Sequence, residues 1–256
     1  MNLTLEGSMH FKLISSASNP EVKAVKKLNK RDSSLFTVEG EKLISVAVAS
    51  GYVMESCWST EKSQQLTLPE GTALRQVTKN LYRSLSPTKS SNGPLCVFQK
   101  KRIKGNFNKH SGRYLLLDSI QDPGNAGTMI RAAKAFGLDG ILWYGSKLNI
   151  YKHALIRASA GASMTMNHYE LNLTLVGDCG QLEWIAATAN EGTPLDRFKW
   201  PNSYVLCMGN EGHGLSHEIN QLCHKRLTVP MNRHVESLNV AGATHIILYD
   251  ARHKSQ

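Results

Sequence analysis

The chain has 256 residues, of which 41% are hydrophobic and 20% are charged. This length and balance predict a soluble globular protein with one large domain or two of ordinary size. The 30 Lys and Arg residues exceed the 20 Asp and Glu residues, and the net charge of +10 favours a polyanionic partner such as nucleic acid. No apolar run is long enough to cross a bilayer, so a membrane partner is not expected.

The five cysteines are scattered along the chain and show no spacing typical of metal ligands. Their odd number and their apolar surroundings predict reduced thiols that serve as small core residues. The first residues lack the basic start and apolar centre of a secretory signal. We therefore expect a cytoplasmic protein without a structural metal.

A small α/β domain is expected in residues 1–105. Its first helix is predicted at Asn19, Pro20 and Glu21, which combine an N-cap, a first-turn proline and an acid near the positive helix end. Apolar runs alternating with helical patterns complete the domain. Strands are expected at residues 35–38, 53–58, 73–77 and 94–99, with further helices at residues 42–49 and 78–85.

Basic side chains gather at two places in this domain. The first helix has an apolar line on one face and lysines on the other, and a second basic run occupies residues 100–104. A charged helix face is often only solvated, so RNA contact and simple solubility both stay open for the helix. The candidates for RNA contact are Lys23, Lys27, Lys30, Lys100, Lys101 and Arg102.

A polar linker is expected at residues 106–113, followed by a second α/β domain at residues 114–256. Its near-continuous apolar strands alternate with helices, which predicts a parallel sheet covered on both faces. Strands are expected at residues 114–118, 141–144, 184–189, 204–208 and 227–229, and helices at residues 127–136, 155–160, 216–223 and from about 238 onward.

Three of these strands end in polar, glycine-containing loops at residues 118–131, 208–215 and 229–241. Ligands of open parallel sheets bind beyond the carboxyl ends of the strands, so these loops are candidates for a site. The second loop is not a dinucleotide fingerprint, because its glycine spacing is wrong and Glu211 stands where phosphates would approach. Ser237, taken alone, is more simply the cap of the last helix.

Taken in order, the three loops resemble the three motifs of the SpoU (TrmH-type) RNA methyltransferases. The motifs are Asp-Pro-Gly-Asn-Ala-Gly-Thr-Met-Ile-Arg-Ala-Ala (residues 122–133), Gly-Asn-Glu-Gly-His-Gly-Leu-Ser (209–216), and Val-Pro-Met (229–231) followed by Glu-Ser-Leu-Asn-Val-Ala (236–241). The resemblance covers residues 114–253. It implies an α/β fold with a deep trefoil knot (the SPOUT fold), a homodimer, S-adenosylmethionine as methyl donor and an RNA ribose 2′-hydroxyl as acceptor.

The resemblance also assigns roles to single residues. Asn125, Arg131, Glu211, Ser237 and Asn239 stand at catalytic positions, whereas Thr188, Gly209, Val229 and Leu238 stand where the family binds the cofactor. The family's assignment of Arg131 as a base conflicts with a guanidinium pKa above about 12. A clamp on RNA phosphate that also stabilises the developing alkoxide suits arginine better. The sequence leaves both roles open.

The segment Phe-Thr-Val-Glu-Gly-Glu-Lys (residues 36–42) is similar to an RNA-recognition domain found in some family members, which favours ribosomal RNA over tRNA. Residues 149–153 depart from the acidic or Ser-Pro segment that relatives often carry. A tRNA ribose 2′-O-methyltransferase and a non-catalytic RNA-binding or assembly protein are the alternatives. A dehydrogenase does not fit, because the dinucleotide fingerprint is missing.

Overall fold

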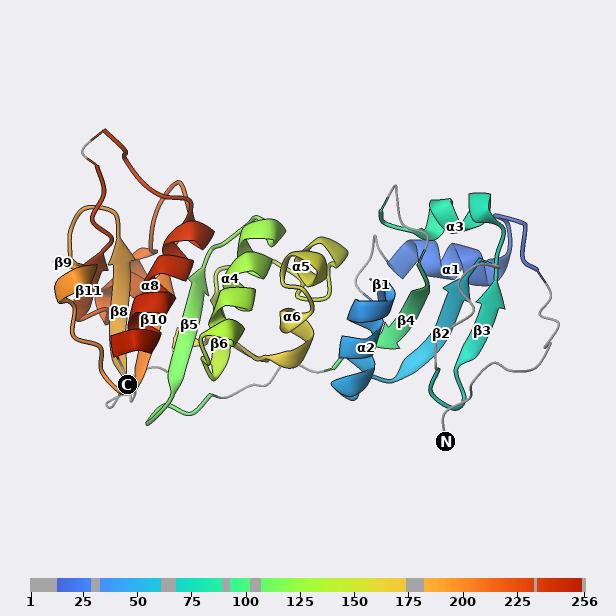
Figure 1. Cartoon of the computed structure of the whole chain (residues 1–256), viewed down its shortest axis with the longest axis horizontal. Helices are drawn as coiled ribbons and strands as arrows, with labels where there is room; N and C mark the ends of the chain where they lie inside the picture. The colour runs from blue at the N-terminus through green and yellow to red at the C-terminus, as the bar shows by residue number, and fades with distance from the viewer. Residues whose placement is uncertain are drawn as a thin grey trace. The chain divides into compact units, whose positions relative to one another are not determined.

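The computed structural model describes residues 13–28, 33–60, 68–88, 93–101, 107–173, 182–232 and 234–254. The chain forms two compact α/β units (Figure 1). The first comprises Met1–Lys101 together with Tyr151–Arg157, and the second comprises Arg102–Ile150 and Ala158–Gln256.

The first unit is built on a mixed four-stranded sheet in the order β1-β4-β2-β3. Strand β4 is antiparallel to β1 and β2, and β3 is parallel to β2. Apolar residues of α1 and α3 pack together with one face of this sheet. All four expected strands are confirmed. The elements are α1 (Pro20–Leu28), β1 (Leu35–Glu39), α2 (Glu41–Ala49), β2 (Met54–Ser59), β3 (Ala73–Gln76), α3 (Lys79–Leu85) and β4 (Leu95–Gln99).

The segment Tyr151–Arg157 belongs to this first unit although it lies far along the chain. The ring of Tyr151 packs 4.5 Å from the ring of Phe36. Its hydroxyl accepts from the backbone N–H of Lys101 at 3.0 Å and donates to the carbonyl of the same residue at 2.8 Å. We expected residues 114–256 to form one continuous domain, but a helix pattern does not reveal which core the helix joins.

A buried carboxylate lies inside the first unit. Glu39 is only 6% exposed and accepts hydrogen bonds from the hydroxyls of Tyr82 and Ser86, at 2.9 and 2.6 Å, and of Thr88. The Nε2 atom of His153 lies 3.7 Å from the Glu39 carboxylate. Burial lowers the pKa of His153, and the Glu39 charge opposes this shift. Three neutral donors thus compensate the desolvation of a buried acid.

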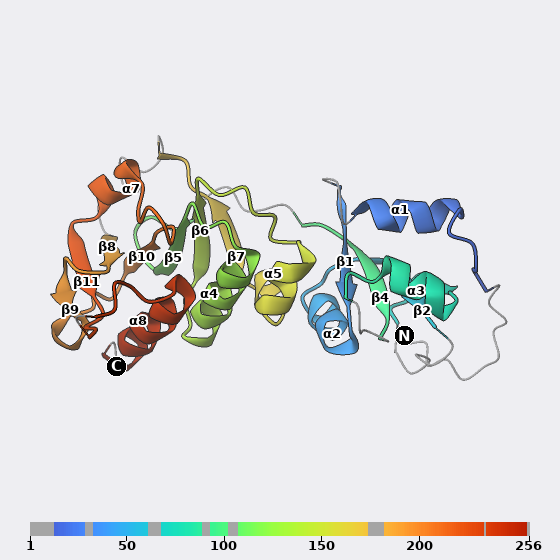
Figure 2. The ribbon, with the colours of Figure 1, turned by 90° about the horizontal axis from the view of Figure 1, so that it is seen from above.

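The second unit contains a seven-stranded sheet in the order β7-β6-β5-β10-β8-β11-β9, and every neighbouring pair is parallel. Helices α4 and α8 lie on one side of the sheet and α7 on the other (Figure 2). The prediction of a parallel sheet covered on both faces is confirmed. The elements of the second unit are β5 (Arg113–Asp118), α4 (Pro123–Ala135), β6 (Gly140–Tyr144), α6 (Ala162–Thr165), β7 (Asn167–Glu170), β8 (Glu183–Thr188), β9 (Thr193–Pro194), the 3-10 helix η2 (Leu195–Arg197), β10 (Tyr204–Met208), α7 (His217–Leu222), β11 (Lys225–Thr228) and α8 (Val240–Lys254). Helix α5 (His153–Ala158) lies between β6 and α6 in the sequence, but all of it except Ala158 belongs to the first unit.

Four of the five cysteines lie among the described residues. Cys57, Cys96, Cys207 and Cys223 are buried and free, as expected for reduced core thiols; Cys179 lies outside the described residues. Within the described part of the chain, no helix has the length and apolar character required to span a membrane.

His168 of β7 occupies a polar position inside the core of the second unit, where it is 5% exposed. The indole N–H of Trp143 donates to its Nδ1 at 3.0 Å, and its Nε2 lies 2.8 Å from the carbonyl oxygen of Ser163. The ring therefore accepts at one nitrogen and donates at the other, which requires the neutral form. Burial lowers the pKa of His168 from its ordinary 6.5 to about 4.

This shift predicts a loss of stability in acid. Between pH 6.5 and 4 the unfolded chain binds a proton at this residue that the folded chain does not. The stabilisation is therefore present above pH 6.5 and is lost as the pH falls toward 4, by on the order of 3 kcal/mol. Urea unfolding at pH 7.5 and 4.5 should show this loss in the wild type. It should be smaller in His168→Gln and unchanged in His224→Gln, an exposed histidine; equal losses in all three proteins would refute the assignment.

Candidate active site

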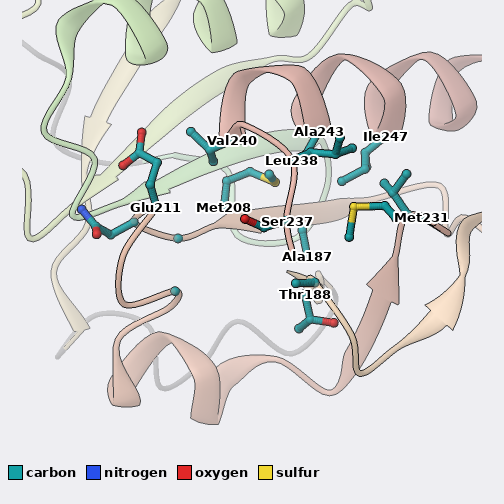
Figure 3. A pocket seen from close by; sticks show the side chains of 15 residues that line it. Ala187, Thr188, Met208, Glu211, Met231, Ser237, Leu238, Val240, Ala243 and Ile247 are labelled. Carbon is teal, nitrogen blue, oxygen red and sulfur yellow. The ribbon is translucent and has the colours of Figure 1, made fainter. Parts of the chain in front are cut away.

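The three polar loops meet at one edge of the parallel sheet. Strands β5, β10, β8 and β11 are consecutive and parallel, so their carboxyl ends lie together. A pocket opens at this edge, with Glu211 and Met231 near opposite ends of the labelled side chains (Figure 3). It is lined by the ends of three strands and the beginning of α8, through Ala187, Thr188, Ala189, Met208, Gly209, Asn210, Glu211, Gly214, Val229, Met231, Ser237, Leu238, Val240, Ala243 and Ile247.

The loop after β10 is a closed turn that carries Glu211 near its tip. Asn210 and Gly214 exchange two backbone hydrogen bonds, at 2.9 and 2.8 Å. The turn brings Gly209 against the backbone of Gly214 so closely that a Cβ atom on Gly209 would lie 2.2 Å from the Gly214 carbonyl carbon. Only glycine can occupy position 209 without moving the turn.

One polar side chain from each motif joins a hydrogen-bonded chain beside the pocket. The Asn125 amide donates to Glu211 Oε1 at 2.5 Å, and the Asn239 amide donates to Asn125 Oδ1 at 3.2 Å. A carboxylate can only accept, so Glu211 fixes the orientation of the Asn125 amide. The structure therefore brings together three of the five predicted catalytic residues.

N-cap hydrogen bonds at the beginnings of α4 and α8 hold both asparagines in place. Asp122 caps α4 by accepting from the backbone N–H of Asn125 at 2.7 Å. Asn239 caps α8, because its Oδ1 accepts from the backbone N–H groups of Ala241 and Gly242 at 3.0 and 3.3 Å. Asn239 thus provides the cap that the isolated sequence pattern suggests for Ser237. Ser237 instead contributes to the pocket wall.

Arg131 does not join the hydrogen-bonded series formed by Asn239, Asn125 and Glu211. Its exposed side chain follows Asn125 by six residues on α4, which places it about 120° around the helix axis from Asn125. Its guanidinium forms no hydrogen bond with the residues that the structure describes. A single copy of the chain therefore leaves Arg131 available for another partner.

All four residues expected to bind the cofactor line the pocket: Thr188, Gly209, Val229 and Leu238. The hydroxyl of Thr188 donates to the carbonyl of Glu191 at 2.6 Å, so Thr188 has mainly its backbone to offer. Sequence reasoning missed the apolar walls formed by Met208, Met231 and Ile247. Only the position of Met231, directly after Val-Pro in the third motif, could have indicated one of them.

The lysines expected to bind RNA differ in their surroundings. Lys23 and Lys27 are exposed on α1. The Lys101 ammonium instead donates to the carbonyl of Ser50 at 2.5 Å and lies 4.6 Å from the centre of the Tyr52 ring. Lys100 lies 5.7 Å from the Tyr151 ring centre. Lys30 and Arg102 are outside the described residues.

Comparison with known families and relatives agrees with this geometry. The model of the SpoU rRNA methylase family matches residues 112–249, which hold all three motifs. The chain belongs to the SpoU rRNA methylase family. Residues 19–96 match a second model, the MRM3-like substrate-binding domain. The enzyme class and the α/β fold predicted from the three motifs are confirmed, and the enzyme's cofactor is S-adenosylmethionine.

Individual relatives resemble the chain over nearly its whole length. The 23S rRNA (guanosine(2553)-2′-O)-methyltransferase RlmP of Bacillus subtilis is 28% identical over 252 residues, covering 94% of this chain and all of the relative. A TrmH-family protein from Porphyromonas gingivalis has a TM-score of 0.80 at 27% identity, covering 93% of this chain and 98% of that one. The AdoMet-bound rRNA methyltransferase of Sinorhizobium meliloti has a TM-score of 0.82 at 23% identity, covering 95% and 98%, which supports the fold.

The pocket fits S-adenosylmethionine in its chemistry. Apolar walls from Ala187, Val240 and Ile247 suit an adenine ring, and the side-chain-free backbone at Gly209 permits close approach of a ligand. The Glu211 carboxylate at one end complements a cation. Among the described residues, no group of three His, Cys, Asp or Glu side chains could hold a metal.

The contact between Gly209 and Gly214 predicts the effect of one methyl group. Gly209→Ala places its Cβ against backbone that cannot yield, so S-adenosylmethionine should bind at least about tenfold more weakly. In Gly212→Ala, the nearest atom to the new Cβ is the side-chain oxygen of Asn210 at 3.4 Å, and affinity should stay within about threefold. Calorimetry on both full-length variants tests this. Unchanged binding in Gly209→Ala would contradict the role of the turn.

Proposed function

We propose that this enzyme transfers the methyl group of S-adenosylmethionine to a ribose 2′-hydroxyl of ribosomal RNA. The observation that carries the proposal is the series of hydrogen bonds from Asn239 to Asn125 to Glu211, which joins all three motifs beside the pocket. The similarity to RlmP over 94% of the chain supports ribosomal RNA as the substrate. The match of residues 19–96 to a substrate-binding domain supports RNA binding by the first unit as well.

The reaction needs little from the protein, because a sulfonium methyl group is already activated when bound. Bound S-adenosylmethionine would supply the methyl group to the ribose oxygen and leave as S-adenosylhomocysteine. The hydroxyl proton would pass to the carboxylate that accepts the hydrogen bond of the hydroxyl. The protein aligns the hydroxyl with the methyl group and accepts the hydrogen bond of the hydroxyl. Glu211 Oε1 is held by Asn125, so we assign the other carboxylate oxygen to the ribose. Asn125, Asn239 and Ser237 orient these groups.

We assign Arg131 to an RNA phosphate rather than to the proton. Its side chain is exposed and separate from the polar chain, which suits a group that meets the substrate backbone. A planar guanidinium matches phosphate through two parallel hydrogen bonds. We assign the cofactor to the pocket through Thr188, Gly209, Val229 and Leu238, which all line it. The exposed Lys23 and Lys27, together with Lys30, Lys100 and Arg102, are candidates for further RNA contact.

We also propose that the enzyme is a homodimer in the cytoplasm and that its C-terminal segment forms the knot of the family. The outer face of α8 exposes Ile246 at 43% and Tyr249 at 55%. These residues lie three positions apart on one helix face, where a second copy would cover them. Sedimentation equilibrium of the wild type beside Tyr249→Glu tests the dimer, and a monomeric wild type would refute it.

Transfer of a tritiated methyl group from S-adenosylmethionine tests the substrate. Ribosomal RNA and tRNA from cells lacking the enzyme are compared, and the labelled RNA is digested to nucleosides. We expect label in ribosomal RNA, recovered as a 2′-O-methylnucleoside. Label in tRNA alone would show that the substrate is tRNA and not ribosomal RNA. RNA binding without any transfer would favour the non-catalytic alternative.

The assignment of Arg131 predicts a separation of catalysis from cofactor binding. Arg131→Ala should leave S-adenosylmethionine affinity nearly intact and lower the single-turnover rate about a hundredfold or more, as for other lost charge-stabilising donors. Arg131→Lys should recover little, because lysine lacks the planar fork. Arg197→Ala, which removes an arginine with an 81% exposed side chain, is the control. Lost cofactor binding in Arg131→Ala would place this residue in the pocket instead.

A further inference from the structure

We propose that Asn210 is a positioning residue for methyl transfer. It joins the loop of the second motif to the loop of the first and so holds Glu211 against Asn125. This inference rests on the proposed function, because it concerns how the reacting carboxylate is placed.

Both ends of the Asn210 side chain are used within the protein. Its amide nitrogen donates to the carbonyl of Ser119 at 3.0 Å, and its amide oxygen accepts from the backbone N–H of Gly212 at 2.9 Å. Glu211 lies in the chain between Asn210 itself and Gly212, whose N–H the Asn210 side chain holds. Asn210 lines the pocket, but its polar atoms are engaged with the protein, so it acts through Glu211 rather than as a ligand.

The hydrogen bond to Ser119 separates Asn210 from an ordinary turn residue. Asn108 also accepts from a backbone N–H two residues ahead, that of His110, at 3.0 Å. Such local turns are common for asparagine. The Asn108 amide, however, reaches only Ser111, three positions away, whereas the Asn210 amide reaches a carbonyl 91 positions earlier in the chain.

Ser119 is a rigid anchor for this bond. Its φ angle of 55° is positive, which is uncommon for a residue other than glycine. Two hydrogen bonds hold it there: its N–H donates to the carbonyl of Tyr144 at 2.8 Å, and its hydroxyl donates to Asp118 at 3.0 Å. A strained residue held in this way is typical of functional sites. The carbonyl that Asn210 meets therefore has a fixed direction.

The C-terminal end of the second-motif loop is also joined to the end of β5. The backbone N–H of Ser216 donates to Asp118 Oδ2 at 2.6 Å, and Asp118 is fully buried. The loop from Gly209 to Ser216 is thus fixed to the end of β5 on both sides of Glu211. The Asn125–Glu211 bond of 2.5 Å depends on this placement, and a misplacement of about 1 Å can slow a reaction about a hundredfold.

Two variants of Asn210 test the bond to Ser119. Asn210→Asp keeps the acceptor for Gly212 but sets an oxygen against the Ser119 carbonyl. Asn210→Ser also keeps a local acceptor, avoids the new charge and is too short to span the loops, so it serves if the aspartate variant does not fold. We expect the single-turnover rate at saturating substrates to fall about thirtyfold or more, with S-adenosylmethionine affinity within about threefold. The control Asn108→Asp should stay within about twofold of the wild-type rate.

A double-mutant cycle with Glu211→Ala distinguishes positioning from an independent effect. If Asn210 acts through Glu211, adding Asn210→Ser to Glu211→Ala should slow the reaction no further. Multiplied losses, a wild-type rate in both Asn210 variants, or cofactor binding weakened more than about tenfold would each overturn the inference. Full activity of Glu211→Ala would do so as well, by removing Glu211 from the mechanism. A wild-type enzyme that methylates no RNA would refute the proposed function itself.

Discussion

The active-site arrangement depends on the parallel direction of β5, β10 and β11. Asn239 and Asn125 are 114 positions apart and Glu211 is 86 positions from Asn125, yet the three side chains form one hydrogen-bonded chain. Parallel strands deliver the loops to one edge, and the helix caps then fix the side chains. The Asn239 side chain has two roles. Its amide oxygen caps α8, and its amide nitrogen donates to Asn125.

The sequence predicted most strands, the parallel sheet and the three motif loops, because apolar runs and turn residues act locally. It missed β7, whose residues Asn167–Glu170 are mostly polar; this strand lies at the edge of the sheet, and its histidine is buried only because Trp143 and Ser163 satisfy it. It also missed the place of Tyr151–Arg157 in the first unit and the role of Asn210. These features depend on contacts between distant segments, which no local pattern contains.

The motif at residues 36–42 acquires a structural meaning from Glu39. Glu39 belongs to the segment that is similar to an RNA-recognition domain, but its side chain is buried. The residue is 6% exposed and accepts three hydroxyl hydrogen bonds. A group so buried cannot meet an RNA backbone, and its charge would in any case repel phosphate. Lys101 is exposed, but its ammonium already donates to the Ser50 carbonyl and lies over the Tyr52 ring. The exposed lysines of α1 are therefore better placed than Lys101 to attract RNA.

Among the described residues, Glu211 is held by an asparagine and forms no salt bridge. An arginine at hydrogen-bonding distance would offset the carboxylate charge and occupy its oxygens in pairs. The Asn125 amide binds one carboxylate oxygen and brings no charge, so in the proposed mechanism the second oxygen is available for the ribose hydroxyl. The carboxylate charge favours the sulfonium side of the cofactor. Under the proposed function, the separation of Arg131 from Glu211 keeps both groups available, Glu211 for the ribose hydroxyl and Arg131 for an RNA phosphate.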